Sequence, residues 1–160
     1  MSTDTILRDH LSRALAWSEA HVSFDDAVDG LAPELRGVRP AGLPHSAWEL
    51  LEHLRLAQED ILEYCVSADY RERKWPDDYW PPTPAPPSDA AWDESVAAYR
   101  ADRAAMQKLA MDPANELTAD VPYGAAGHTW LREILLVLDH GAYHVAQLVQ
   151  VRQALGAWRP

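Results

Sequence analysis

Two histidines, His140 and His144, lie four residues apart in a long apolar segment near the end of the chain. On an α-helix, residues at this spacing occupy one face, one turn apart, so both imidazoles point the same way. Two such rings can bind one divalent cation, but two ligands seldom hold a metal tightly. We therefore expect a third ligand from another element, and His53, in the strongly helical segment 46–55, is the best candidate.

Three imidazoles from two helices would favour particular metals and a particular kind of site. Neutral nitrogen donors suit zinc, nickel, copper or ferrous iron better than calcium or magnesium. Three protein ligands also leave a fourth position open, which is typical of catalytic rather than structural zinc. The sequence thus predicts a metal site formed by His53, His140 and His144, with room for a small molecule beside the metal.

The histidine pattern also has plainer explanations. Histidines at this spacing often serve as hydrogen-bonded core residues, in which case no metal is bound. Two further histidines are candidate additions to the site: His21, in the predicted first helix, and His128, just before the last helix. His21 is equally explained as a residue of an amphipathic helix, and His128 as an exposed loop residue.

Two carboxylates are candidate general bases, Asp60 first and Glu133 second, with His21 as a third choice. Asp60 falls on the same helical face as the predicted ligand of the second helix, and a buried carboxylate there needs a partner. It would either orient a metal-bound histidine or pair with an arginine such as Arg132 or Arg152. Glu133 shares the stripe of the last helix that carries the two histidines, and a core ion pair would explain it as well.

Four long helical segments must position these side chains. The first runs from about Asp4 to Gly30, and the second begins at Ser46, where Glu49 completes a capping box. Capping explains Glu49, so we rank it below the histidines as a ligand. The apolar stripe of the first segment, expected to face the interior, consists of His10, Ala14, Trp17, His21, Phe24 and Val28.

The third predicted helix starts near Ser88 or Asp89 and ends near Asp112. The fourth starts after the N-cap Thr129 and ends near Leu155, before Gly156. The fourth is apolar almost all round, which predicts that it is buried on more than two sides or covered by a second subunit. A homodimer is expected partly on this ground.

A connection rich in proline and aromatic residues, from about residue 74 to 88, separates the second and third helices and contains six of the 12 prolines. Proline at this density excludes helix and central strand. Trp75, Tyr79 and Trp80 would be costly to leave exposed together. We expect an ordered arm that covers an edge of the core or one side of the site, with a proline-rich partner-binding motif as the alternative.

Composition limits the remaining classes. A chain of 160 residues with 48% hydrophobic residues suits one domain over residues 1–160. The net charge of −11 and scattered basic residues argue against a nucleic-acid partner and against binding to an anionic membrane. Cys65 is the only cysteine, so no intrachain disulfide forms. The aliphatic run 134–138 is too short to span a bilayer. A cytoplasmic, all-α four-helix bundle is expected.

Several segments together resemble the DinB-like proteins, a group that includes metal-dependent hydrolases of the YfiT type. The last helix reads Asp139-His-x-x-Tyr-His-x-x-Gln147 and is followed by Arg152-Gln-Ala-Leu-Gly-Ala-Trp158. The second helix reads Trp48-Glu-Leu-Leu-Glu-His53-Leu, and segments 75–81 and 127–133 are similar to one branch of the group. The resemblance implies a four-helix bundle that holds a divalent metal, often nickel or zinc, on His53, His140 and His144.

The same resemblance is compatible with an enzyme, although many members of the group have no known activity. Members characterised as enzymes include transferases and isomerases that use a low-molecular-weight thiol such as bacillithiol or mycothiol. We therefore expect a metal-dependent hydrolase or thiol-dependent transferase that acts on a small-molecule substrate. A non-catalytic bundle that binds a metal or a small ligand is the alternative.

Overall fold

The structure is a computed structural model that describes residues 2–158, and this part of the chain is helical without a β-strand. An isolated bridge joins Asp120 to Thr129. The all-α prediction is confirmed. The helices are α1 (Thr3–Ala14), α2 (Phe24–Val28), α3 (Ala47–Val66), α4 (Asp89–Met111) and α5 (Trp130–Ala154), with short 3-10 helices η1 (Pro33–Leu35) and η2 (Asp77–Tyr79).

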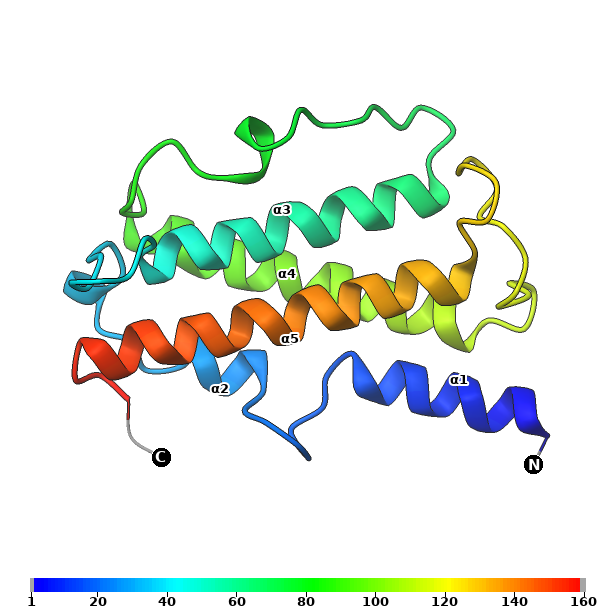
Figure 1. The fold of residues 1–160 in the computed structure, drawn as a ribbon, viewed down its shortest axis with the longest axis horizontal. Coiled ribbons are helices and arrows are strands. Elements are labelled where there is room, and N and C mark those ends of the chain that lie inside the picture. Colours follow the sequence, from blue (N-terminus) through cyan, green and yellow to red (C-terminus); the bar gives the residue numbers. More distant parts are fainter. Residues whose placement is uncertain (1, 159–160) are drawn as a thin grey trace.

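The four longer helices form a bundle with one crossover. In Figure 1, α3 and α4 run in the same direction, while α1 and α5 run antiparallel to them. Two consecutive parallel helices need a connection that returns along their whole length. The segment 67–88, hereafter the arm, makes this return along α3 and includes η2 (Figure 1). The predicted connection rich in proline and tryptophan is thus a structural layer over α3.

The helix starts follow the local signals in the sequence. Ser46 caps α3, and both halves of its capping box with Glu49 are present. Ser88 caps α4 and Thr129 caps α5, each through a side-chain oxygen that accepts a backbone N–H. Gly156, with φ of +68°, follows the end of α5 as the predicted stop.

The predicted single helix from Asp4 to Gly30 is wrong, because the chain leaves helical geometry after Ala14 and re-enters it at Phe24. Ser23 accepts the N–H of Asp26 and caps α2 as a separate helix. The break lets α1 pack against α4 while α2 packs against α5. Only part of the predicted stripe therefore faces the core: Phe24 and Val28 are buried, whereas His10 and His21 are exposed.

Helix α5 is buried along one side and keeps large apolar side chains on the other. Leu135 is 46% exposed and Leu136 is 38% exposed. The homodimer predicted from this helix stays a prediction. No helix within residues 2–158 is both long enough and apolar enough to cross a membrane.

Candidate metal centre

Helices α3 and α5 bring His53, His140 and His144 together, and we call these three residues the triad. One potential ligand atom of each residue lies within 4.8 Å of the others, and no further histidine, cysteine or acidic residue of the described chain joins the group. His53 Nε2 is 3.1 Å from His140 Nε2. His53 and His144 are buried and His140 is half-buried. The predicted convergence of imidazoles from two helices is therefore present.

Hydrogen bonds on the far side of two rings fix where their lone pairs point. His53 Nδ1 lies 2.9 Å from the carbonyl oxygen of Tyr79, and His144 Nδ1 lies 2.7 Å from Gln147 Oε1. Both oxygens can only accept, so each Nδ1 carries the proton. In the neutral rings the Nε2 atoms are then bare lone pairs, which is the tautomer that ligates a metal through Nε2. The residues present fit a divalent cation.

The triad is held in its neutral form. Burial, reinforced by His144 and His53, lowers the pKa of His140 to about 3. Burial, reinforced by His53, lowers the pKa of His144 to about 4, and burial also lowers the pKa of His53. Uncharged imidazoles at neutral pH need no deprotonation before they bind a metal.

The arm supplies one wall of the site, as predicted. Trp80 stacks face to face on His53, with ring centroids 4.0 Å apart and an interplanar angle of 1°. His45 stacks on Trp80 at 4.2 Å, so the indole lies between two imidazoles. His45 has no periodic relation to the triad in the sequence, and nothing in its spacing pointed to this position. Trp75, predicted to be covered, is instead 68% exposed.

Asp60 lies near an arginine, as one of the two expectations has it, but this is Arg73 and not Arg132 or Arg152. Its carboxylate accepts the hydroxyl of Tyr79 at 2.6 Å and that of Tyr70 at 3.1 Å, and Arg73 Nε lies 3.7 Å away. The link to the histidines is indirect, because the carbonyl of the same Tyr79 orients His53. The arm folds back far enough to bring these tyrosines to α3, which a helical periodicity cannot show.

Glu133 belongs to a second polar cluster at the start of α5. It is 2% exposed, pairs with Arg132, and lies 3.8 Å from His128 Nδ1. His128 Nδ1 also lies 2.8 Å from the Tyr64 hydroxyl. Glu133 precedes His140 by two helical turns, about 10 Å along the axis. His128 and Glu133 are therefore near one another and apart from the triad, and His21 is exposed with Nδ1 bonded to the Val22 carbonyl.

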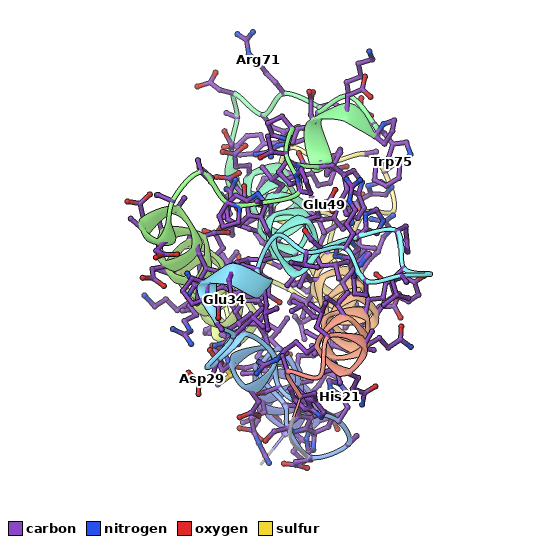
Figure 2. All side chains as sticks on the ribbon, turned by 90° about the vertical axis from the view of Figure 1, so that its left-hand side faces the viewer. His21, Asp29, Glu34, Glu49, Arg71 and Trp75 are labelled. Atoms are coloured by element: carbon purple, nitrogen blue, oxygen red, sulfur yellow. The ribbon has the colours of Figure 1, made fainter. Side chains whose placement is uncertain are left out.

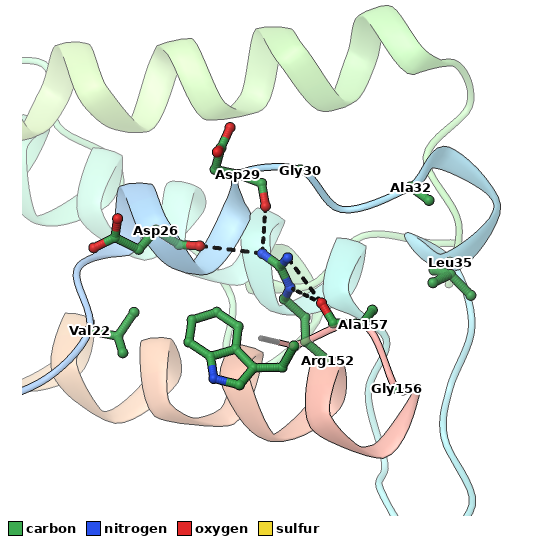
Figure 3. A pocket seen from close by; sticks show the side chains of 10 residues that line it. Val22, Asp26, Asp29, Gly30, Ala32, Leu35, Arg152, Gly156 and Ala157 are labelled. Atoms are coloured by element: carbon green, nitrogen blue, oxygen red, sulfur yellow. Dashed lines mark hydrogen bonds between the residues drawn. The ribbon is translucent and has the colours of Figure 1, made fainter. Parts of the chain in front are cut away.

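A cavity of about 880 Å³ lies beyond the triad, at the C-terminal end of α5. Its dominant polar group, Arg152, donates to the carbonyls of Asp26, Ala27, Asp29 and Ala157 and sits 5.1 Å from the Trp158 ring centroid. Figure 3 shows the bonds to Asp26, Asp29 and Ala157. These carbonyls use the guanidinium donors that would otherwise bind an anion. Arg152 thus anchors α2 and the chain end to α5, and it is not the partner of Asp60.

The chain matches the family model of the DinB superfamily over residues 16–148. The protein belongs to the DinB superfamily. The matched range includes the whole triad, the arm and α3, so the predicted family resemblance is confirmed over most of the molecule. Comparison with curated proteins and with solved structures gave no match. Within this DinB superfamily chain, the triad is the one group of three or more metal-ligating side chains in residues 2–158.

Proposed function

We propose that the protein is a metal-dependent enzyme whose divalent ion, zinc or nickel, is held by His53, His140 and His144. The observation that carries the proposal is the convergence of three neutral imidazoles, two of which have their lone pairs fixed by Tyr79 and Gln147. Three ligands leave a coordination position for a substrate. When bound, such an ion supplies either a water of pKa about 7 or a site where a thiol is held as its thiolate.

Two reactions are expected from the sequence. Transfer to a low-molecular-weight thiol needs fewer catalytic side chains around the metal than hydrolysis does. For hydrolysis, a bound water with a pKa of about 7 would be only partly deprotonated at neutral pH, so an adjacent general base would assist it. Asp60 and Glu133 each have other partners, and neither carboxylate joins the triad. A thiol would be held on the metal as its thiolate, with its proton released to solvent, so no separate base would be required. The roles of Asp60 and Glu133 in proton transfer stay predictions.

The chain's own residues have defined tasks in this proposal. Tyr79 and Gln147 hold the imidazoles in one tautomer and one orientation. Trp80 covers a face of His53 and keeps water from that side. Asp60 fixes the Tyr79 side chain to α3 and so keeps the arm in register with the triad.

Metal content of protein purified without a nickel column tests the proposal. We expect close to one zinc or nickel per chain by elemental analysis, no metal in His140→Ala, and unchanged metal in His10→Ala, a matched control at an exposed position. Wild-type protein that still lacks metal after loading and dialysis would contradict the proposal.

Activity assays then separate an enzyme from a binder. Metal-loaded protein is incubated with a thiol and a panel of electrophiles, and separately with ester and amide panels. Turnover that depends on His140 supports the enzyme. Metal without turnover in any panel supports the alternative, a non-catalytic bundle that binds a metal or small ligand. Turnover that survives in metal-free His140→Ala would show that the mechanism is wrong.

A further inference from the structure

The two most exposed large hydrophobic side chains of residues 2–158 both lie against the triad. Trp75 is 68% exposed and Tyr143 is 62% exposed, above every other large hydrophobic residue described as exposed. The Trp75 ring centroid is 6.3 Å from that of His53, and the Tyr143 ring centroid is 4.9 Å from that of His144. Tyr143 is the chain neighbour of His144, so its nearness follows from the sequence, whereas the path of the arm brings Trp75 to His53.

The two rings reach the triad from different elements. Trp75 belongs to the arm, and Figure 2 shows it at the edge of the molecule, beside η2. Tyr143 belongs to α5 and meets His144 edge to face, at an interplanar angle of 89°. Trp80 differs from both, because its two faces are covered by His53 and His45. Trp75 and Tyr143 therefore offer the free aromatic surface, while Trp80 serves as a wall.

Charged groups near this surface are not suited to hold an anionic substrate group. Two of the three basic residues of the arm are already paired, Arg73 with Glu59 and Lys74 with Asp77 at 2.9 Å, and the third, Arg71, points away from the bundle (Figure 2). Asp139, which neighbours His140, is exposed and acidic. Recognition beyond the metal would therefore come from apolar and aromatic contact, which two exposed rings supply at low entropic cost.

We propose that Trp75 and Tyr143 form a binding surface for the aromatic part of the substrate, whose thiol or other metal-binding group lies at the triad. This inference rests on the proposed metal site and names the substrate class for it. The ring of the substrate stacks on or packs edge to face with Trp75 and Tyr143, and the contact selects aromatic molecules over aliphatic molecules of similar size.

Thiol binding to the cobalt-loaded protein tests the proposal without any assay of activity. The probes are benzyl mercaptan, cyclohexylmethanethiol of similar size, and 2-mercaptoethanol, each titrated by the thiolate-to-cobalt charge-transfer absorption. We expect benzyl mercaptan to bind most tightly. Trp75→Ala and Tyr143→Ala should each weaken it roughly threefold to tenfold, while 2-mercaptoethanol binds with unchanged affinity. Trp75→Phe should restore most of the loss.

Tyr123→Ala is the matched control, because Tyr123 is 53% exposed but lies in the loop before α5. It should leave all three affinities unchanged. Equal affinity of benzyl mercaptan and cyclohexylmethanethiol, or equal affinity in wild type and both alanine variants, would overturn the proposal while leaving the metal site intact. Failure of cobalt to bind would overturn the proposed function, and this inference with it.

A second copy of this chain is the alternative partner for the Trp75 and Tyr143 rings. Analytical ultracentrifugation measures such self-association. We expect the association state of wild type, Trp75→Ala and Tyr143→Ala to be the same. A wild-type dimer that dissociates in both variants would show that the rings serve a subunit interface, and the proposal would be overturned.

Discussion

Two clusters containing histidine lie along α3 and α5, and they differ in what their polar atoms contact. In the cluster at the start of α5, His128 lies between the Tyr64 hydroxyl and the Glu133 carboxylate, which also pairs with Arg132. In the triad, the Nε2 atoms of His53 and His140 face each other at 3.1 Å, and no charged side chain is among the three. The first cluster is complete without a ligand, whereas the triad gathers lone pairs that only a cation or a proton can share.

The comparison shows why burial and residue type alone are poor guides to function. Glu133 is 2% exposed, the same as His53, yet its contacts with Arg132 and His128 explain it as a link between α5 and the preceding loop. The triad is recognised by the direction of its lone pairs, which the bonds to Tyr79 and Gln147 determine.

Zinc should stabilise the folded protein by binding to the triad, and the cluster at the start of α5 should not contribute to zinc binding. At a zinc concentration 100 times the Kd, linkage adds about 2.7 kcal/mol, which raises the thermal midpoint by roughly 5–10 °C for a protein of this size. Differential scanning fluorimetry with and without zinc measures the shift. His53→Ala should lose it and His128→Ala should keep it. An equal shift in both variants would show that the triad does not bind zinc in preference to the second cluster.

Gln147→Leu should weaken the metal site without removing a ligand. The substitution removes the acceptor of His144 Nδ1, and loss of such an outer hydrogen bond typically costs 10- to 100-fold in metal affinity, so a drop of about this size is expected. Competition with a coloured chelator measures the affinity, and Gln150→Leu, at an exposed position on the same helix, is the control. Unchanged affinity would mean that Gln147 does not orient the ring.

Glu133→Ala should lower stability and spare metal binding. Removing a buried carboxylate takes away the partner of Arg132 and leaves unfilled space in the core, at a cost of about 1–3 kcal/mol. Urea denaturation gives the free energy of unfolding, and metal affinity should change less than twofold. A large loss of metal affinity would connect Glu133 to the triad and support its predicted catalytic role.

Stability of the metal-free protein should fall as the pH drops from 6.5 toward 5, and the triad should account for part of the slope. The folded pKa values of His140 and His144, about 3 and 4, lie below the usual value of 6.5. In this window the unfolded chain binds more protons, so stability rises with pH and is lost on acidification. Urea denaturation across the window should show a smaller slope for His140→Ala than for His10→Ala. Equal slopes would show that burial does not suppress protonation of His140.

Local signals predicted much of the molecule. Ser46 with Glu49, Ser88, Thr129 and Gly156 each act within one turn of the chain, and all four appear in the structure with their expected roles. The spacing of His140 and His144 placed two ligands on one face for the same reason. His53 was found because α3 is long and regular, so its face could be read from its periodicity.

The errors have a common physical origin. The first helix breaks because α2 packs against α5 through tertiary contacts, while the apolar spacing stays helical across the break. Asp60 finds its tyrosine partners because the arm returns along α3, and that path depends on the whole bundle. His45 reaches Trp80 by the same folding of distant segments. The contacts that the arm and the segment before α3 make with the rest of the bundle were thus the part that residue patterns could not provide.

The double attachment of Tyr79 has an evolutionary consequence. Its hydroxyl donates to Asp60 of α3, and its carbonyl oxygen accepts from His53. The arm therefore determines the orientation of a buried imidazole. Insertions, deletions or proline substitutions in the arm would change the orientation of His53, and with it the reactivity of the site, while all three ligands stay the same. Relatives with identical histidines but different reactions would then be expected to differ in the segment that corresponds to the arm.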